Sequence, residues 1–520
     1  MLKKNKTDSK SYTDDNIVRG KAFSVFTITD AISSLIVLIS GVILARLLPK
    51  TQLGIYREIT FVYSFVVPFM LLEFPTAILY FLPRFKGEDR WHYIGFTYLY
   101  SVIAGIVFIL IFFFLSPFFE TYGTKVNGTA SLFLLISIAA PFTFITTFFR
   151  QILITIRELK TLFFFGMVYA LLSFLPVLAY FFAINNRTEL QVYLIFAVLI
   201  QNAICSMLSI YWFISNKERK YDLPQLNLHK LLKFSIQTWK EQFNYSIYFV
   251  ARLPMVLLAK DFAKLIIMGF LSADSFATYT IGAVVIPFLP TLRTALVNTL
   301  VPEVAKEYHE TCKISRKTLN VWRRATQLLA FIIIPAFVFL EVFGYEFIVG
   351  LYTKKYINSV PIFRVFLILI ISYLFGYDIF LQGIGRTRPI FISSIIFLAT
   401  NISTSLVLFK YFGLIGPAIG TIIANFISAA YLWNEARKVL GEEPFGSVLR
   451  KSFLKIFIES LLAAIIMKSI LFFAGFALNY LIQLAIGLVG SACLVLLIWY
   501  FRYPDILIEL ISLAKIISKK

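Results

Sequence analysis

Apolar runs of about 20 residues constrain the fold of this chain more than any other feature. Each run is long enough to cross, as a helix, the roughly 30 Å hydrocarbon core of a bilayer. About fourteen of them recur along the 520 residues, at 22–45, 59–82, 93–116, 129–152, 161–184, 190–214, 243–270, 276–301, 325–343, 361–382, 389–409, 414–433, 453–475 and 479–500.

These runs predict an all-α integral membrane protein. Lipid offers the backbone no hydrogen-bond partner, so each spanning segment must be a helix, and alternating barrel strands are not visible. The composition agrees, because 59% of the residues are hydrophobic, 15% are charged and the mean hydropathy is +0.82. Residues 1–21 are polar and basic, without the apolar core of a secretory signal, and we expect a cytoplasmic tail there.

The chain contains an internal repeat, in which matching passages lie about 220 to 230 residues apart. The passage "ILARLLPKTQLGIYREI" at 43–59 resembles "IIMGFLSADSFATYTIG" at 266–282, and "RQILITIRELK" at 150–160 resembles "LQGIGRTRPI" at 381–390. Six runs fill each copy, so both copies should have the same orientation. We therefore predict two six-helix lobes as a parallel repeat and a C-terminal helix pair outside it. The predicted boundaries are 22–215 for the N-lobe, 216–235 for a basic cytoplasmic linker, 236–435 for the C-lobe and 436–520 for the helix pair with a basic tail.

The net charge of +21 is explained by membrane topology. If the N-terminus is cytoplasmic, most of the 49 Lys and Arg residues fall in cytoplasmic segments, as the positive-inside rule requires. This predicts a multi-pass protein of the cell (cytoplasmic) membrane with both termini in the cytoplasm. Basic clusters would contact anionic membrane lipids. No nucleic-acid-binding motif accompanies them, so we expect no nucleic-acid partner.

Cofactor, metal and catalytic signatures are missing from the sequence. Three cysteines and three histidines are scattered, without the spacing of a disulfide framework or a metal site. The glycine-rich "GIGRTRP" has neither the strand context nor the Gly-Lys-Ser/Thr ending of a nucleotide-binding loop. We therefore expect no metal, no cofactor and no catalytic residue.

Charged residues inside apolar runs are candidate functional groups, because a charge in a bilayer is costly unless it faces water or a partner. In the seventh run, Arg252, Lys260 and Lys264 fall at about 0°, 80° and 120° on a helical wheel and share one broad face. Such cations could bind a phosphate-bearing headgroup, and Arg293 and Arg364 could join them. The alternative is that the lysines extend to the membrane interface.

Acidic residues within the runs are candidate ion-coupling groups: Asp30, Glu73, Asp261 and Asp378. A carboxylate at such a position could carry a proton or a sodium ion, whereas the alternative is a structural ion pair. Asp261 lies three residues before Lys264 and could pair with it. For Glu58, beside Arg57 at the start of the second run, we expect an interfacial pair.

The ordered series "ILARLLPKTQLGIY", "EFPTAILYFLPRF", "GFLSADSFATYTIGAVV", "LVPEVAKEY", "LQGIGRTRP" and "YFGLIGPAIGTIIANF" resembles the polysaccharide-biosynthesis flippases of the multidrug/oligosaccharidyl-lipid/polysaccharide (MOP) exporter superfamily. The resemblance runs through most of the chain. It implies a fold like that of multidrug and toxin extrusion (MATE) transporters, with two six-helix lobes and a terminal helix pair. It also implies a lipid-linked oligosaccharide substrate that crosses the membrane by alternating access, with other polysaccharide-assembly membrane proteins as further partners.

Three classes of function fit these observations. The leading hypothesis is a flippase for a lipid-linked oligosaccharide that bears phosphate or pyrophosphate. A MATE-type cation-coupled drug antiporter is the first alternative, although a cationic drug would need carboxylates rather than cations in its site. A membrane-embedded polysaccharide polymerase or ligase is the second. We expect no enzyme, because the outer loops are short and only a transporter explains the duplicated lobes.

Overall fold

The structure is a computed structural model and describes residues 32–85, 87–156, 158–183, 190–220, 228–286, 288–441, 443–444, 446–473 and 479–504. Within these ranges the regular structure is helical, and no strand is present. Ten helices in this part of the chain are long and apolar enough to cross a membrane, and a shorter apolar helix covers Ile32–Leu47. The prediction of an all-α, multi-pass membrane protein is confirmed.

The chain divides into two compact units, Met1–Pro254 and Met255–Lys520, which we call the first and the second unit. The division falls inside one long helix, α10 (Leu228–Phe270), which contains Pro254. The predicted lobe and linker boundaries stay a prediction, because a division by contacts does not locate a functional hinge.

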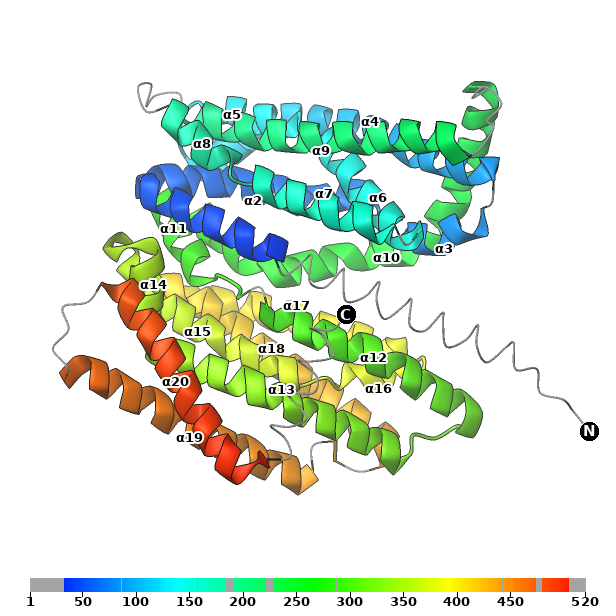
Figure 1. Cartoon of the computed structure of the whole chain (residues 1–520). Coiled ribbons are helices and arrows are strands. Elements are labelled where there is room, and N and C mark those ends of the chain that lie inside the picture. The colour runs from blue at the N-terminus through cyan, green and yellow to red at the C-terminus, as the bar shows by residue number, and fades with distance from the viewer. Residues whose placement is uncertain are drawn as a thin grey trace, which may run out of the picture. The chain divides into compact units, whose positions relative to one another are not determined.

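The first unit consists of the helix Ile32–Leu47, eight further α-helices and the beginning of α10 (Figure 1). α4 packs against α5 and α6, and α9 packs against α6 and α8. The elements after the first helix are α2 (Lys50–Leu71), α3 (Phe74–Phe81), η1 (Leu82–Arg84), α4 (Glu88–Phe119), η2 (Glu120–Thr124), α5 (Thr129–Ser137), α6 (Ala140–Ile156), α7 (Leu159–Leu172), α8 (Leu175–Phe182) and α9 (Leu190–Lys220).

The second unit contains the rest of α10 and the helices that follow it. α17 and α18 form a close antiparallel pair, and the C-terminal helices α19 and α20 pack on α13 and α14 of the same unit. The elements are α11 (Ala273–Gly282), α12 (Phe288–Thr311), α13 (Arg316–Val342), α14 (Gly344–Tyr352), η4 (Lys354–Ser359), α15 (Val360–Ile371), η5 (Ser372–Leu374), α16 (Asp378–Gly383), α17 (Thr387–Phe412), η6 (Gly413–Ile415), α18 (Gly416–Leu440), α19 (Gly446–Phe473) and α20 (Tyr480–Arg502).

Several of the apolar runs are broken helices rather than continuous ones. The second run breaks between α2 and α3, where Leu72 and Glu73 both have positive φ angles of 49° and 54°. The eighth run breaks between α11 and α12, and the tenth breaks between α15 and α16. Hydrophobicity alone predicts the length of a run, but it does not report a local change of backbone direction inside it.

The repeated passage that the sequence shows marks equivalent helix starts. Lys50 begins α2 after Pro49, and Ala273 begins α11 after Ser272, whose side-chain oxygen accepts a hydrogen bond from the Ser275 amide at 3.4 Å. In both places an apolar helix ends just before this turn. The similarity in sequence therefore corresponds to a similarity in local structure.

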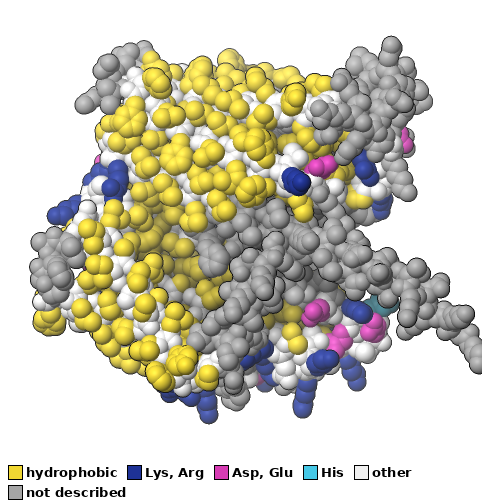
Figure 2. Space-filling model, viewed as in Figure 1, with side chains coloured by type: hydrophobic (Ala, Val, Ile, Leu, Met, Phe, Trp, Pro, Cys, Tyr) yellow, Lys and Arg dark blue, Asp and Glu magenta, His cyan; other side chains and the backbone are white. Residues whose placement is uncertain are grey.

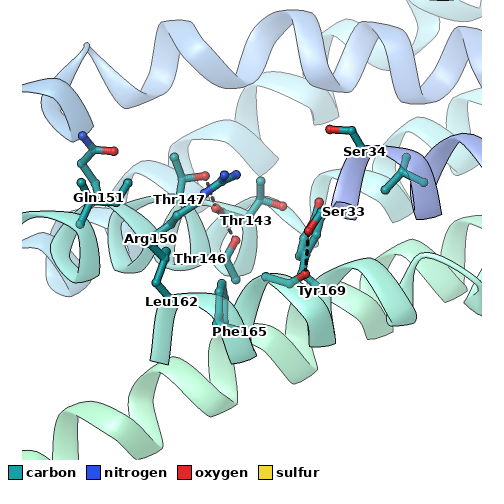
Figure 3. Close-up of a pocket in the computed structure, with 13 residues that line it drawn as sticks. Ser33, Ser34, Thr143, Thr146, Thr147, Arg150, Gln151, Leu162, Phe165 and Tyr169 are labelled. Atoms are coloured by element: carbon teal, nitrogen blue, oxygen red, sulfur yellow. Dashed lines mark hydrogen bonds between the residues drawn. The ribbon is translucent and has the colours of Figure 1, made fainter. Parts of the chain in front are cut away.

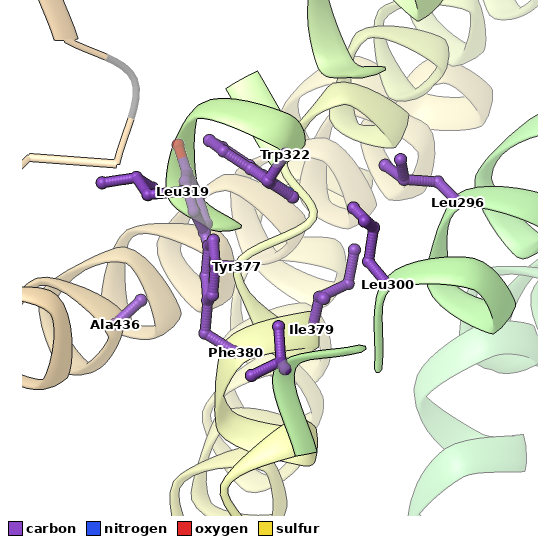
Figure 4. Packing of buried hydrophobic residues seen from close by; sticks show 9 residues of the cluster. Leu296, Leu300, Leu319, Trp322, Tyr377, Ile379, Phe380 and Ala436 are labelled. Carbon is purple, nitrogen blue, oxygen red and sulfur yellow. The ribbon is translucent and has the colours of Figure 1, made fainter. Parts of the chain in front are cut away.

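Aromatic and aliphatic side chains fill the interior of each unit. In the second unit, Trp322 of α13 is 1% exposed and lies over Tyr377 and Phe380, with ring centroids 6.3 and 5.3 Å away (Figure 4). Leu296 and Leu300 of α12 complete this cluster. Packing of this kind fixes the short helix α16 against α12 and α13.

The pair α17–α18 is packed through small residues and a buried polar group. A Cβ atom on Gly420 would lie 2.6 Å from Ser405 Oγ, so the two helix backbones are in close contact. Asn401, which is 0% exposed, donates from Nδ2 to the Ala259 carbonyl at 2.8 Å and accepts from Ser405 Oγ at 2.8 Å. These contacts join α10, α17 and α18.

The outer surface is apolar where helices would face lipid. Figure 2 shows hydrophobic side chains over much of the described surface in that view, and Lys and Arg side chains in small scattered groups, most of them near its margins. Large exposed side chains such as Phe114, Phe182 and Phe473 are 76%, 82% and 83% exposed. A water-soluble protein would not expose so much contiguous apolar surface, whereas a bilayer covers it.

Candidate functional site

A pocket of about 620 Å³ lies within the first unit, between the helix Ile32–Leu47, α6 and α7 (Figure 3). Six of its lining residues carry a hydroxyl group, one carries a guanidinium and one carries an amide, and none of the lining residues is acidic. The lining residues are Ser33, Ser34, Val37, Thr143, Thr146, Thr147, Arg150, Gln151, Ile154, Leu162, Phe165, Gly166 and Tyr169.

The sequence of α6 places most of the polar groups on one side of that helix. Thr143, Thr146, Thr147, Arg150 and Gln151 follow one another at spacings of one, three or four residues, and such positions share one face of a helix. The opposite face of α6 is buried in the unit, for example through side chains that are 0 to 1% exposed: Phe144, Phe148, Phe149 and Ile152. Burial of this apolar face therefore turns the polar face toward the pocket.

The threonine hydroxyl groups present oxygen acceptors to the pocket. Thr146 Oγ1 and Thr147 Oγ1 both donate to the Thr143 carbonyl, at 2.9 and 2.7 Å. Thr143 Oγ1 donates to the Ala139 carbonyl at 3.0 Å, and Ser33 Oγ donates to the Gly166 carbonyl at 3.2 Å. Thr143 Oγ1 also accepts a hydrogen bond from the Tyr63 hydroxyl at 2.6 Å. Because the hydrogens of Ser33, Thr146 and Thr147 are used by backbone carbonyls, the lone pairs of these three oxygens remain available to donors such as sugar hydroxyl groups.

Arg150 supplies the positive charge of the pocket. Its side chain is exposed to the pocket, and Figure 3 shows the guanidinium beside the side chains of Thr143 and Thr147. A guanidinium offers five N–H donors in a planar fork, which matches the two oxygens of a carboxylate or a phosphate. The charge of Arg150 also interacts with the Tyr169 side chain. The pocket thus combines a fork-shaped donor with hydroxyl acceptors and an apolar wall that includes Phe165.

Two of the candidate headgroup cations are paired with two of the candidate coupling carboxylates. Lys264 Nζ lies 2.7 Å from Asp261 Oδ1, as their three-residue spacing predicts. Arg293 of α12 lies 3.1 Å from Asp378 of α16, a pairing that the sequence does not reveal. These side chains are 12 to 32% exposed, so each pair is largely removed from solvent.

The other candidates have different surroundings. Lys260 and Arg364 are exposed, and the charge of Arg364 acts on Glu341. Glu73 Oε2 accepts a hydrogen bond from Thr76 Oγ1 at 2.9 Å. Arg252 lies on α10, but its side chain is outside the described part, as is all of Asp30, which precedes Ser33 by three residues. The roles proposed for these residues stay predictions.

The expectation of an interfacial pair at Glu58 is wrong. Its side chain is 0% exposed, and neither carboxyl oxygen accepts a hydrogen bond within the described part of the chain. The reason is that α2 begins at Lys50, so Glu58 lies two turns inside the helix instead of at its end. The exposed Lys125 is close enough to interact with it electrostatically.

The sequence alone did not indicate a pocket around Arg150, although Arg150 is the first residue of one of the repeated passages. The signal that could have found it is the pattern of Thr143, Thr146, Thr147 and Arg150 along a single apolar run. Each threonine is ordinary in a membrane helix, because its hydroxyl can bond to its own backbone. Only the convergence with Ser33, Ser34 and Tyr169 from other helices makes the pattern a pocket.

Known structures have the same fold at low sequence identity. The lipid II flippase MurJ in an inward closed conformation matches with a TM-score of 0.64 and 18% identity, over 92% of this chain and 99% of MurJ. An inward-facing multidrug resistance MATE family transporter of the MOP superfamily matches with a TM-score of 0.56 and 14% identity, over 82% and 99% of the two chains. An outward-facing MATE family transporter matches at 0.53 and 16%, over 83% and 96%.

Sequence comparison identifies a family. No curated protein matches the chain. The family model described as polysaccharide biosynthesis protein matches residues 43–361, which is more than half of the chain. Together with the fold shared with MOP-superfamily transporters, this match shows that the chain belongs to the polysaccharide biosynthesis protein family.

Proposed function

We propose that this protein is a flippase that moves a lipid-linked oligosaccharide from the cytoplasmic to the outer leaflet for the synthesis of a cell-surface polysaccharide. The pocket around Arg150 binds the saccharide and an anionic group attached to it. The two predicted six-helix lobes rock against each other during transport so that the substrate site opens to one side of the membrane at a time, as the parallel repeat in the sequence predicts. Arg252 and Lys260 are proposed as further contacts for the phosphate.

The observation that carries this proposal is the chemistry of the pocket. Arg150 is the charged residue of the lining, and the hydroxyl oxygens and the Gln151 amide surround it. A saccharide presents many hydroxyl donors and, with its carrier phosphate, an anion. A charge-assisted, bidentate contact to such an anion is stronger and more selective than a contact between neutral groups.

The same chemistry disfavours the alternative of a cationic drug antiporter. A cationic substrate would meet the positive charge of Arg150, and the described lining contains no carboxylate to compensate for it. The family match to polysaccharide biosynthesis proteins points in the same direction.

The test is transport by Arg150→Gln, with Lys160→Gln as the matched control. Lys160 is an exposed cation of α7 that does not line the pocket. Purified protein is reconstituted in liposomes with lipid-linked oligosaccharide extracted from the host, and flipping is measured as the fraction that an impermeant, saccharide-cleaving enzyme can reach. We expect Arg150→Gln to lower transport by about tenfold to a hundredfold, because the variant loses a charge-assisted hydrogen bond, or a bidentate pair of them, to the substrate anion.

Arg150→Lys should restore part of the activity, because the charge returns without the planar fork. Equal transport by wild type and Arg150→Gln at equal reconstitution would show that the pocket does not bind the transported group. Saturable uptake of a cationic dye with no flipping of the lipid-linked oligosaccharide would favour the drug antiporter instead.

A further inference from the structure

A second cavity lies within the second unit, between α13 and the C-terminal helices α19 and α20. It has a volume of about 290 Å³, and most of its wall is apolar. The lining residues are Phe331, Pro335, Ala336, Phe339, Ser460, Ala464, Leu488, Ser491, Ala492, Val495, Leu496 and Trp499. This cavity is separate from the pocket around Arg150, which is formed by helices of the first unit.

Three polar groups line this cavity without a hydrogen-bond partner in the described part of the chain. They are Ser460 Oγ, Ser491 Oγ and Trp499 Nε1. Their residues are only 2%, 6% and 4% exposed, so bulk water does not satisfy them. Buried polar groups of proteins are nearly always hydrogen-bonded, and a group that is not indicates a partner from outside the chain.

A single buried water molecule cannot supply the missing hydrogen bonds of these polar groups. Ser491 and Trp499 are eight residues apart on α20, a rise of about 12 Å, so a single water molecule cannot bridge them. A buried water molecule typically makes about three hydrogen bonds, and the apolar side chains of the wall offer none. A ligand that is mostly apolar and carries a few acceptor oxygens fits the lining better.

The polar end of the cavity lies near a charged end of the helix pair. Arg502, the last residue of α20, lies 2.7 Å from Glu459 of α19, and its side chain is 54% exposed. Ser460 is the residue after Glu459, and Trp499 is one helical turn before Arg502. Trp and Arg at the end of an apolar helix are typical of the depth at which lipid headgroups and ester groups lie.

The cavity opens toward the surface that would face lipid. Leu488, Ala492 and Leu496 are exposed and are spaced four residues apart along α20, so they form one edge of the opening. Nearer the start of α20 the packing is tighter, because a Cβ atom on Gly487 would lie 2.5 Å from the Phe343 ring. An acyl chain could therefore enter between the helices only beyond that contact.

We propose that this cavity binds a membrane glycerophospholipid, one acyl chain of which fills the apolar space between α13, α19 and α20. Its ester carbonyl oxygens accept hydrogen bonds from the Trp499 indole N–H and the Ser460 hydroxyl, and its phosphate lies beside Arg502. Ser491, deeper along α20, receives no partner from this arrangement. The lipid joins the C-terminal helix pair to α13 and does not depend on the proposed transport function.

Lipid retention tests the proposal. The full chain is delipidated in detergent, incubated with 1-palmitoyl-2-oleoyl phosphatidylglycerol and analysed by native mass spectrometry. Ala492→Phe places a ring in the opening, and Ala485→Phe, on an exposed position of the same helix outside the cavity, is the matched control. We expect Ala492→Phe to lower the bound fraction by about tenfold and Ala485→Phe to leave it unchanged.

A second variant tests the polar contacts. Trp499→Phe with Ser460→Ala removes both donors and keeps a ring against Phe331, whose centroid lies 4.5 Å from that of Trp499. We expect about a tenfold weaker retention and a loss of the rise in thermal midpoint that the lipid gives to the wild type. If Ala492→Phe does not fold, this double variant still tests the proposal.

Two results would overturn the assignment. Equal phospholipid retention by the wild type, by Ala492→Phe and by the double variant would place the bound lipid elsewhere. Displacement of the phospholipid by an added polyprenyl phosphate at equimolar concentration would identify the occupant as the tail of a polyprenyl carrier instead of a glycerophospholipid. Neither result bears on the Arg150 pocket, whose test measures flipping.

Discussion

Separating the ion pair Arg293–Asp378 should destabilise the second unit by an amount that its geometry predicts. The guanidinium nitrogen lies 3.1 Å from Asp378 Oδ1, and Gln382 Nε2 donates to the other carboxylate oxygen at 3.1 Å. The pair joins α12 to α16 beside the cluster around Trp322. At an effective dielectric constant of about 20, this separation corresponds to about 5 kcal/mol of direct attraction.

The net contribution is smaller, because both groups lose hydration on folding. The side chains are 32% and 16% exposed, which places the pair between a surface and a buried salt bridge. We therefore expect a coupling energy of about 1 to 2 kcal/mol. Arg293→Gln alone leaves a mostly buried carboxylate that still accepts a hydrogen bond from Gln382, and it should cost about 2 kcal/mol of unfolding free energy.

A double-mutant cycle with Arg293→Gln and Asp378→Asn measures this coupling. Denaturant titration of the purified chain in mixed micelles gives the unfolding free energy of the four proteins. The double variant should be less destabilised than the two single variants together by about 1 to 2 kcal/mol. Additive effects within about 0.3 kcal/mol would refute the reasoning, since they would show that the two side chains do not stabilise each other.

The same four proteins distinguish a structural role from a role in transport. If Arg293 and Asp378 act only as a pair, the double variant should flip substrate at nearly the wild-type rate. If Arg293 also binds a headgroup, as its position in an apolar run predicts, transport should remain low although stability is partly restored.

Three further predictions concern packing, burial and topology. Gly420→Leu should prevent the close contact of α17 and α18 and lower the yield of folded protein, because its Cβ would lie 2.6 Å from Ser405 Oγ. Gly269→Leu is the control, since nothing lies within 4 Å of a Cβ at that position. Equal yields of the two variants would contradict the close-packing argument. Glu58→Gln should leave the thermal midpoint within about 2 °C of the wild type, because an uncharged side chain suits a buried site where the carboxyl oxygens accept no hydrogen bond from the described part of the chain. A large decrease would mean that Glu58 is a paired anion. Cys312, an exposed thiol in the segment between α12 and α13, should react with an impermeant maleimide only after the cells are permeabilised, and labelling of intact cells would reverse the predicted orientation.

The sequence by itself determined the class of fold. Hydrophobic runs of membrane-spanning length without the alternation of barrel strands require helices, since a helix satisfies every backbone hydrogen bond within its own segment. The repeat also gave correct local information, because Lys50 and Ala273 both begin helices after an apolar segment. The pairing of Asp261 with Lys264 could be predicted as well, since both side chains belong to the same turn of one helix.

The tertiary structure alone decided the candidate site and the partners of most charged groups. Arg293 and Asp378 are 85 residues apart, and nothing in the local pattern of either run indicates that α12 and α16 meet. The hydrophobic pattern placed Glu58 at the end of a helix, but Glu58 lies inside α2 and tertiary packing buries its side chain. The Arg150 pocket needs residues from three helices. Periodicity along one helix tells which side chains share a face, but the neighbour of that face is set by long-range packing, which a single sequence does not encode in any local signal.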